Sequence, residues 1–410
     1  MIELAEPGDL IDEDQRLPLG SVVPTVARGN DILLTGATGY LGAFLLHELL
    51  EQTTGRVYCV VRAGDEAAAM ARLRAAAGRF LLPRPDDRRV HAVPGDLRDI
   101  AEVAALFGDG ELGRRIGHIV HCATRVVFGE PYRTLREDNV LPTADLLAWA
   151  RGHGIRDFSY VSSLTAAGPA VWAGNRYLET LAQPLDPEAD GYGAAKWVCE
   201  RLLGRAEQDG MRIRVFRPGL LMASSTTGAS NDKDLMYFKL LAGLAIGAHP
   251  RDDRTLVMAP VDMVAMAIAG LALSPGSAGR AYHLAAERGI SLRALFTLLE
   301  STGLTTEPLP PPQWQQRVRE LAVKTRNPIL AAAALLDLQG LAEGDGAVEA
   351  AGWQPWLHRS GLDPRVTGEA LRRGIEYLAS RDGLARDLVG HLVTRDGEHV
   401  EGEQGEGAYS

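Results

Sequence analysis

Short apolar runs alternate with longer amphipathic stretches along the first two thirds of the 410-residue chain. The apolar runs have the length and residue types of strands, and they lie at 31–35, 56–61, 89–93, 118–123, 157–163, 212–218 and 280–285. The stretches with helical periodicity lie at 40–52, 65–80, 99–107, 139–151, 192–210 and 261–273. Alternating strands and helices indicate βαβ units. We therefore expect an α/β fold with a Rossmann-type, doubly wound parallel sheet covered by helices on both faces.

The alternation weakens beyond about residue 222, and a mostly helical region follows. We expect four parts: a lead-in segment at 1–27, a Rossmann domain at 28–275, a smaller helical C-terminal substrate region at 276–395 and a disordered acidic tail at 396–410. The lead-in is polar and proline-bearing without helical or strand periodicity, so we expect it to pack at the domain edge. The loops at 165–190 and 222–260 are expected to join the helical region over the site.

Composition and charge limit the classes of partner. Hydrophobic residues make up 46% of the chain and charged residues 23%, as in ordinary globular proteins, and the formal net charge is −10. Nucleic acids and anionic membranes need a basic surface, so we expect neither as a partner. No apolar run is long enough to span a membrane and no secretory signal follows Met1, so we expect a cytoplasmic protein. The three cysteines have no metal-ligand spacing.

The segment GATGYLG follows the first strand and opens the first long helix, with Gly36, Gly39 and Gly42 at G-x-x-G-x-x-G spacing. Such glycines allow a tight turn, a close backbone approach to pyrophosphate and close packing of helix on strand. A phosphate would then lie on the helix N-terminus, where free N–H groups and the helix dipole favour an anion. The predicted cofactor-binding residues of this loop are Thr35, Gly36, Thr38, Gly39, Tyr40, Leu41 and Gly42.

The residue after the second strand discriminates between the two nicotinamide dinucleotides. An acid there holds the ribose 2′-hydroxyl of NAD, whereas an arginine suits the 2′-phosphate of NADP. Arg62 occupies this position and Arg72 is a second candidate, so we expect NADPH. The alternative is that Arg62 is a solvated surface charge and that Asp65 binds the ribose. Further cofactor contacts are expected from Asp96, which would accept from the adenine amino group, and from Leu97, Ala123, Pro218 and Gly219.

A tyrosine and a lysine on one helix are the candidates for acid–base chemistry. Tyr192 and Lys196 are four residues apart and share one face of their helix. A phenol with pKa near ~10 is a poor acid–base group until a neighbouring charge favours its phenolate, and Lys196 can supply that charge and also bind the nicotinamide ribose. Ser163 can hydrogen-bond the reacting carbonyl oxygen. Ser163, Tyr192 and Lys196 are therefore the predicted catalytic residues, while His121 is interpreted as structural.

These motifs together resemble the extended short-chain dehydrogenase/reductases, and more narrowly the thioester reductase domains of nonribosomal peptide synthetases and carboxylic acid reductases. The resemblance covers residues 28–285 well, and VYCVVRA and PYRTLREDNV are its most specific segments. The other segments that carry it are LLTGATGYLGAFLLHELL, VPGDL, YVSSLTAAG, GYGAAKWVCERLL and RPGLL. The resemblance implies Ser163 rather than Ser162, from its distance to Gly168. The chain departs from it at Val127, where relatives commonly have asparagine.

The resemblance implies NADPH-driven release of an acyl or peptidyl thioester from the phosphopantetheine arm of a carrier protein. The product is an aldehyde, which some relatives reduce further to an alcohol. No carrier or adenylation domain precedes residue 31, so we expect either an excised terminal domain or a free-standing reductase. Two other functions stay open: a sugar-nucleotide epimerase or dehydratase, and a non-catalytic NADP(H)-binding protein.

A docking surface for the carrier is the least defined feature. Carrier proteins of this class are usually acidic, so the resemblance implies a basic patch on the reductase. The candidates are Arg251 with Arg254, or the segment 317–326, and a solvated surface is an equal alternative for each.

Overall fold

The computed structural model describes residues 8–23, 29–105, 111–127, 129–167, 176–181, 184–186, 189–335 and 347–393. The chain clusters into two compact units. Unit 1 comprises residues 1–225, 255–290 and 340–366, and unit 2 comprises residues 226–254, 291–339 and 367–410. The expected boundaries at residues 27, 275 and 395 stay predictions, and the expected acidic tail lies outside the described residues.

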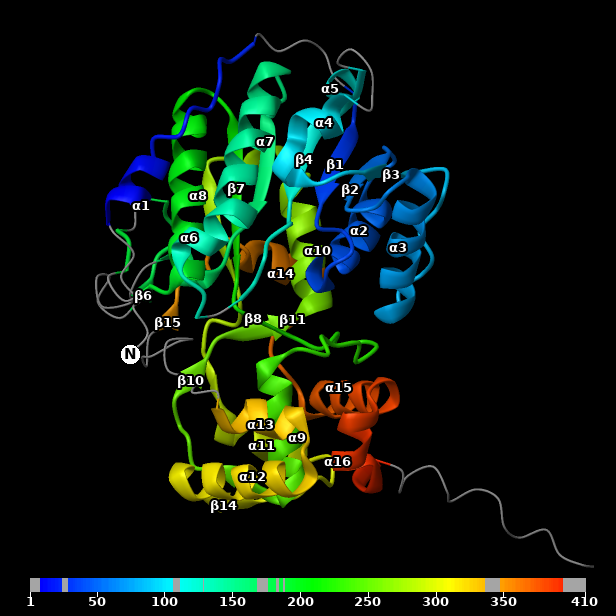
Figure 1. Cartoon of the computed structure of the whole chain (residues 1–410), viewed down its shortest axis with the longest axis vertical. Helices are drawn as coiled ribbons and strands as arrows, with labels where there is room; N and C mark the ends of the chain where they lie inside the picture. Colours follow the sequence, from blue (N-terminus) through cyan, green and yellow to red (C-terminus); the bar gives the residue numbers. More distant parts are fainter. Residues whose placement is uncertain are drawn as a thin grey trace, which may run out of the picture. The chain divides into compact units, whose positions relative to one another are not determined.

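Unit 1 contains the predicted parallel sheet (Figure 1). Within the described residues its strands are β1 (Asp31–Thr35), β2 (Val57–Val61), β3 (Val90–Pro94), β4 (Ile116–His121), β5 (Asp157–Val161), β7 (Arg212–Pro218) and β12 (Arg280–Leu284). They are arranged in the order β12-β7-β5-β4-β1-β2-β3, and every neighbouring pair is parallel. This order reverses beside β1, as in doubly wound dinucleotide-binding folds, so the predicted fold class is confirmed.

Two groups of helices pack within unit 1. One group contains α2 (Tyr40–Gln52), α3 (Glu66–Arg79) and α10 (Val261–Ala272), and the other contains α4 (Ile100–Ala105), α7 (Leu141–Gly152) and α8 (Gly191–Gln208). Local capping explains where two of them begin. The Asp65 carboxylate accepts from the Ala68 N–H at 2.7 Å at the start of α3, and Asp190 accepts from the Gly193 N–H at 2.8 Å at the start of α8.

Shorter elements connect these strands and helices. They are α5 (Glu111–Arg115), α6 (Tyr132–Leu135), a π-helical turn (Arg136–Val140), 3₁₀ turns at Leu97–Asp99, Leu164–Ala167 and Pro275–Ser277, β6 (Arg176–Tyr177), β8 (Leu220–Met222), β10 (Thr255–Leu256), β11 (Met258–Pro260), β15 (Ala347–Val348) and α14 (Gln354–Ser360). The strand β13 (Ile290–Ser291) lies where the chain passes from unit 1 to unit 2.

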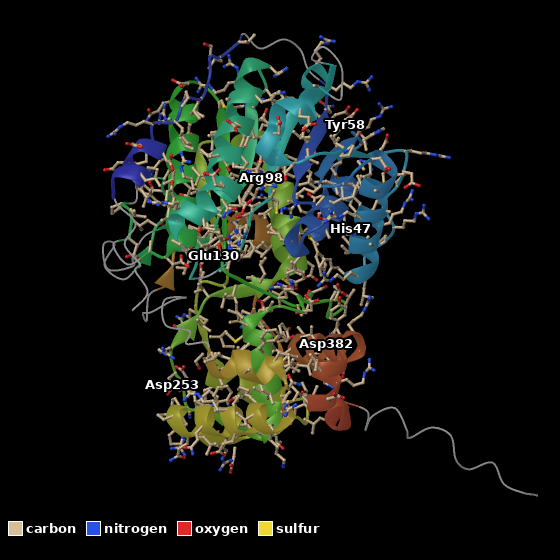
Figure 2. The ribbon with its side chains drawn as sticks, in the orientation of Figure 1. His47, Tyr58, Arg98, Glu130, Asp253 and Asp382 are labelled. Atoms are coloured by element: carbon tan, nitrogen blue, oxygen red, sulfur yellow. The ribbon has the colours of Figure 1, made fainter. Side chains whose placement is uncertain are left out.

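The core of unit 1 is formed by the strands and the apolar faces of their helices. Every residue of β2 is buried, including Cys59, which packs as an apolar side chain. Tyr58, labelled in Figure 2, stacks on His91 of β3 with ring centroids 5.0 Å apart. Each fully buried aliphatic side chain of this core contributes about 1.5–3 kcal/mol to the free energy of unfolding.

The lead-in segment differs from its prediction. Residues Gly8–Asp14 form a helix, α1, although their sequence has no clear helical periodicity. The buried Asp14 carboxylate accepts from the Tyr132 hydroxyl at 2.6 Å and from the Arg136 guanidinium at 2.6 and 2.8 Å. These contacts to distant parts of the sequence, rather than a local pattern, hold the segment in place.

Unit 2 is mostly helical, and the prediction of a loop over 222–260 is wrong in part, because residues 235–246 form a helix with a buried apolar face. Its helices are α9 (Leu235–Ile246), α11 (Leu292–Glu300), α12 (Pro311–Thr325), α13 (Pro328–Leu335), α15 (Gly368–Arg381) and α16 (Gly383–Val393). The strands β9 (Ala248–Pro250) and β14 (Glu307–Leu309) form a short parallel pair. The buried Trp314 of α12 donates its indole N–H to the Ala248 carbonyl at 2.9 Å. Within the described ranges no helix has both the length and the apolarity to cross a bilayer.

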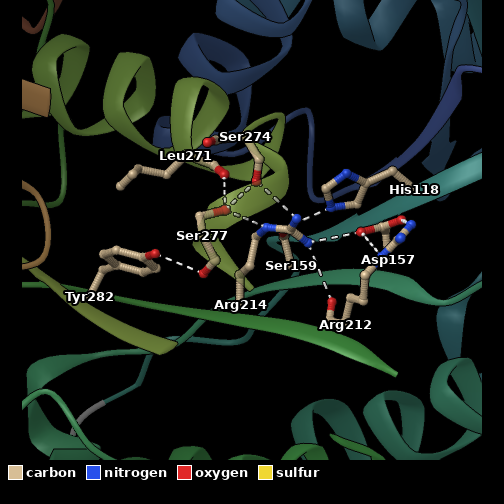
Figure 3. Close-up of polar contacts among 9 residues, drawn as sticks. All are labelled: His118, Asp157, Ser159, Arg212, Arg214, Leu271, Ser274, Ser277 and Tyr282. Atoms are coloured by element: carbon tan, nitrogen blue, oxygen red, sulfur yellow. Dashed lines mark hydrogen bonds and ion pairs between the residues drawn. The ribbon is translucent and has the colours of Figure 1, made fainter. Parts of the chain in front are cut away.

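A polar cluster fastens the turn after α10 to the amino end of the sheet (Figure 3). Arg214 of β7 is only 2% exposed. Its guanidinium lies 3.1 Å from the Asp157 carboxylate and donates to the Ser277 hydroxyl at 2.7 Å and to the Ser274 carbonyl at 3.1 Å. Asp157 also pairs with Arg212, whose side chain is 61% exposed. One carboxylate therefore has a buried and an exposed partner on the same strand.

This arrangement provides a matched test of what holds unit 1 together. We expect Arg214→Met to lower the free energy of unfolding by about 3 kcal/mol or more, because buried acceptors lose their donor. Arg212→Met should cost at most about 1 kcal/mol, because water solvates an exposed pair. Chemical denaturation followed by far-ultraviolet circular dichroism measures both variants, and equal losses would contradict this account of the cluster.

Candidate active site

Most of the predicted cofactor and catalytic residues lie at or just after the carboxyl ends of the sheet strands, whereas Arg72 lies in α3 and Tyr192 and Lys196 lie in α8. The glycine loop follows β1, Arg62 follows β2, Asp96 follows β3, Ala123 follows β4, Ser163 follows β5, Pro218 ends β7 and Gly219 follows it. Because the strands are parallel, these ends share one edge of the sheet. Ligands of open α/β sheets bind in the crevice at this edge.

The loop after β1 turns tightly against neighbouring backbone, with which larger side chains at its glycines would collide. Gly36 has a φ of +77°, and a Cβ added there would lie 2.7 Å from the backbone nitrogen of Ala123. A Cβ on Gly42 would lie 2.0 Å from the Gly36 carbonyl oxygen. Gly39 precedes α2, which has no side-chain cap and no acidic residue in its first turn. An uncapped helix N-terminus behind such a turn fits the pyrophosphate of a dinucleotide.

Thr35 connects the ends of β1 and β4. Its hydroxyl oxygen accepts from the N–H groups of Cys122 and Ala123, both at 3.1 Å. Its lone pairs are then occupied, so the hydroxyl donates to Nδ1 of His121 at 2.7 Å. The other ring nitrogen lies 3.0 Å from the Thr143 hydroxyl, and burial lowers the pKa of His121 to about 3. The ring is therefore neutral and fully bonded, which supports the structural interpretation of His121.

The remaining residues of the loop contact other parts of unit 1. The Tyr40 hydroxyl donates to the Met222 carbonyl at 2.9 Å, and its ring lies edge-on to Phe44. Leu41 is buried and Thr38 is half-buried. These contacts fix the shape of the loop, and any direct contact of these side chains with a cofactor stays a prediction.

Arg62 and Arg72 lie together after β2. Both side chains are exposed, and the Arg72 guanidinium donates to the carbonyl oxygen of Arg62. Asp65, the alternative ribose ligand, caps α3 with one of its carboxylate oxygens. The structure therefore brings two cations to the edge where the ribose of a dinucleotide would lie.

Asp96 and Leu97 follow β3 as predicted, and Leu97 packs against the core. The Asp96 carboxylate accepts from the Arg98 guanidinium at 2.7 Å and from the Arg98 backbone N–H at 3.0 Å. The side-chain hydrogen bond from Arg98 holds the pKa of Asp96 below its ordinary value, and the charge of Arg62 also contributes. Arg98, labelled in Figure 2, is a further cation near the predicted ribose site, and its sequence context does not distinguish it from a solvated arginine.

Ser163 and Tyr192 are brought together by β5 and α8 and share a hydrogen bond. Burial raises the pKa of the Tyr192 phenol above its ordinary value, the Asp190 carboxylate raises it further, and the bond with Ser163 lowers it. That Lys196 favours the Tyr192 phenolate during the reaction stays a prediction. Tyr192 stays a phenol and can donate its proton.

Lys196 lies one helical turn after Tyr192 and is 1% exposed. Its ammonium donates to the Val161 carbonyl at 2.8 Å and lies 4.7 and 5.8 Å from the ring centroids of Tyr160 and Tyr192. Burial lowers the pKa of Lys196 to about 8. The group is therefore charged at neutral pH and loses that charge at mildly alkaline pH.

Ser162 has a different environment from Ser163. Its hydroxyl donates to Glu200 at 2.6 Å, and Glu200 forms an ion pair with Arg217 at 2.5 Å in which both side chains are at most 1% exposed. Arg217 also donates to two carbonyl oxygens of the segment 176–181. Sequence reasoning missed this pair. The signals for it were a glutamate one turn after the lysine and an arginine inside an apolar strand.

Asn139 holds the loop after β4, which contains Val127. Its side-chain oxygen accepts from the Arg125 N–H at 2.7 Å, and its amide donates to the Arg125 carbonyl at 3.0 Å. Asn139 lies in the π-helical turn, a geometry frequent at functional sites. It belongs to a segment that carried the family resemblance, but sequence reasoning gave it no role of its own.

Pro218 ends β7, and Gly219 directly after it is in close contact with neighbouring backbone. The Gly219 N–H donates to the Leu284 carbonyl at 3.3 Å, and a Cβ on Gly219 would lie 2.5 Å from the Val257 carbonyl oxygen. Only glycine fits without displacing that backbone. The predicted contact of these two residues with nicotinamide stays a prediction.

The candidate docking residues lie in unit 2. Arg251 lines a cavity of about 480 Å³ together with His249 and Arg293, whereas Arg254 is paired with Asp252 at 2.7 Å. In the segment 317–326, Arg317 pairs with Glu307 at 2.6 Å, and both side chains are about half exposed. A role for either group in docking stays a prediction.

Comparison with known proteins agrees with the geometry of unit 1. The family model described as male sterility protein, an NAD-binding family, matches residues 34–268, which is more than half of the chain. The chain is 32% identical over 314 residues to an isonitrile lipopeptide synthase of Streptomyces coeruleorubidus, covering 76% of this chain and 21% of that protein. It is 30% identical over 318 residues to the aldehyde reductase lnbA of Aspergillus flavus, covering 73% and 31%. The chain thus spans about a fifth to a third of the length of these relatives.

Among solved structures, the chain is similar to the terminal R domain of the myxalamid biosynthetic pathway. The two share 28% sequence identity with a TM-score of 0.78, over 92% of this chain and 99% of that one. The resemblance to reductase domains that the sequence motifs predicted is confirmed. The chain belongs to the NAD-binding male sterility protein family.

Proposed function

We propose that the protein is an NADPH-dependent reductase that releases an acyl or peptidyl thioester from the phosphopantetheine arm of a carrier protein as an aldehyde. The observation that carries this proposal is the Ser163–Tyr192 hydrogen bond beside the Lys196 ammonium, at the carboxyl edge of the sheet. Two hydroxyl donors and a cation at this position suit reduction of a carbonyl group. The thioester and the carrier are supported by the kinds of protein that the chain is similar to.

NADPH rather than NADH is supported by Arg62 and Arg72 after β2 and by the engagement of Asp65 as a helix cap. When bound, the cofactor supplies a hydride to the carbonyl carbon. The loop from Thr35 to Gly42 would hold its pyrophosphate. The residues proposed to line the rest of its path are Asp96, Leu97, Ala123, Lys196, Pro218 and Gly219.

Ser163 and Tyr192 would hold the thioester oxygen as it gains negative charge. Both side chains donate to this oxygen, and Tyr192 then gives up its proton to form a hemithioacetal. Collapse returns that proton to Tyr192 and breaks the C–S bond. The departing thiolate takes a proton from solvent, and the aldehyde remains. The raised pKa of Tyr192 suits this role, because reduction needs the protonated phenol at the outset.

Lys196 would interact with both the cofactor and Tyr192. Its ammonium can bind the nicotinamide ribose, and it stabilises the Tyr192 phenolate that exists between the two proton transfers. The hydrogen bond to the Val161 carbonyl fixes the ammonium at the end of β5.

The two alternatives are less well supported. A sugar-nucleotide epimerase or dehydratase would be favoured by an acid in place of Arg62. A non-catalytic NADP(H)-binding protein would have no need of the Ser163, Tyr192 and Lys196 set. A second reduction of the aldehyde to an alcohol would use the same residues.

The cytoplasmic location expected from the sequence stays a prediction.

The proposal is tested by product identification. Protein, NADPH and pantetheine thioesters of varied acyl groups should give an aldehyde or alcohol, detected by mass spectrometry, together with free thiol.

Tyr192→Phe should abolish turnover, because the proton donor is lost, while NADPH affinity by fluorescence titration stays nearly unchanged. Wild-type turnover in this variant would overturn the assignment of Tyr192. Oxidation of NADPH by none of the thioesters would overturn the proposed function.

The choice of cofactor is tested by Arg62→Ala. We expect NADPH affinity to fall roughly 10- to 100-fold, because a charge-assisted hydrogen bond to phosphate is lost, while NADH affinity changes little. Arg88→Ala, an exposed arginine before β3, is the matched control and should change neither. An equal loss of NADPH and NADH affinity in Arg62→Ala would show that Arg62 does not bind the 2′-phosphate.

Because the pKa of Lys196 is lowered, we expect kcat/KM to depend on pH. The ammonium is lost as pH rises through about 8, so kcat/KM, which reports the free enzyme, should fall above that pH. In Lys196→Arg the charge persists, and the alkaline limb should disappear even though the rate is lower. A wild-type profile that is flat to pH 10 would contradict the role given to this charge.

A further inference from the structure

The hydroxyl of Thr165 contacts the hydroxyl proposed to bind the oxyanion. Thr165 lies two residues after Ser163, in the 3₁₀ turn Leu164–Ala167, and both side chains are half-buried. The Thr165 hydroxyl lies 3.0 Å from the Ser163 oxygen, and the Thr165 backbone N–H donates to the same oxygen at 3.3 Å. Ser162, which follows β5 and precedes Ser163, donates its hydroxyl to Glu200 and does not compete for Ser163.

Counting donors and acceptors shows what this contact does during the reaction. A serine hydroxyl has one proton to donate and two lone pairs. When Ser163 donates its proton to the developing oxyanion, only its lone pairs are left for Thr165. The Thr165 N–H fills one lone pair, and the Thr165 O–H at 3.0 Å fills the other.

We propose that Thr165 is a positioning residue that aims and strengthens the Ser163 hydroxyl as a hydrogen-bond donor to the reacting carbonyl oxygen. This inference rests on the proposed function and names a further residue of the same site. A hydroxyl that accepts a hydrogen bond becomes a better donor, because successive hydrogen bonds polarise one another. The same contact prevents Ser163 from rotating its proton toward Thr165 and away from the substrate.

The local geometry alone also fits a purely structural turn. A serine oxygen that accepts from the N–H two residues later is a common turn motif. The two roles make different demands, because the turn needs only the backbone N–H of residue 165. The proposed role needs its side-chain hydroxyl.

The test separates these demands with two substitutions. Thr165→Val keeps the backbone N–H and the branched shape but removes the hydroxyl, and we expect kcat with NADPH and an acyl-pantetheine thioester to fall roughly tenfold. The KM for the thioester, NADPH affinity and the thermal midpoint should stay at wild-type values. Thr165→Ser, which restores a hydroxyl, should recover most of kcat.

A double-mutant cycle with Ser163→Ala shows whether Thr165 acts through Ser163. In the Ser163→Ala background, Thr165→Val should cause no further loss of kcat. An active wild type with an unchanged Thr165→Val variant, or an equal loss in both backgrounds, would overturn this inference alone. A wild type that reduces neither thioester nor aldehyde would overturn the proposed function, and this inference with it.

Discussion

The buried ion pair between Glu200 of α8 and Arg217 of β7 is the interaction on which the rest of the site depends. Two charges removed from water destabilise a fold unless neighbouring groups complete their hydrogen bonds. Here the Ser162 hydroxyl, two backbone carbonyls and a histidine ring nitrogen do so. Glu200 lies one turn after Lys196, and Ser162 directly precedes Ser163. The pair therefore fixes, from inside the protein, both elements that carry the proposed chemistry.

Burial also sets the protonation of the groups at this edge. Burial raises the pKa of Tyr192, so this side chain stays a phenol. Burial lowers the pKa of Lys196 to about 8 and that of His121 to about 3, so the ammonium loses its charge near pH 8 and the imidazole is neutral. Burial thus favours the neutral form of all three groups, and Lys196 is the one that still carries its charge at neutral pH. These forms suit the reduction of a carbonyl, in which the phenol must hold its proton when hydride arrives.

The sequence predicted the sheet well, because its strands are short apolar runs separated by amphipathic helices. The limits of β1 and β7 match the predicted 31–35 and 212–218. The glycine loop and the Ser163, Tyr192 and Lys196 set were proposed from local spacing in the sequence, and their roles stay predictions. The helix α1 was missed because it is held by contacts of Asp14 more than a hundred residues away. The Glu200–Arg217 pair and the raised pKa of Tyr192 also could not be predicted, because both depend on which residues the folded chain buries together.

The central claim is that hydride passes from NADPH to the acyl carbon of a thioester. The most direct measurement uses NADPH deuterated at the reactive C4 position with an acyl-pantetheine thioester, and mass spectrometry of the trapped product. The account predicts that the aldehyde carries deuterium on the former thioester carbon and appears together with free pantetheine thiol. Cofactor oxidation with an unlabelled product, or with the thioester left intact, would contradict it.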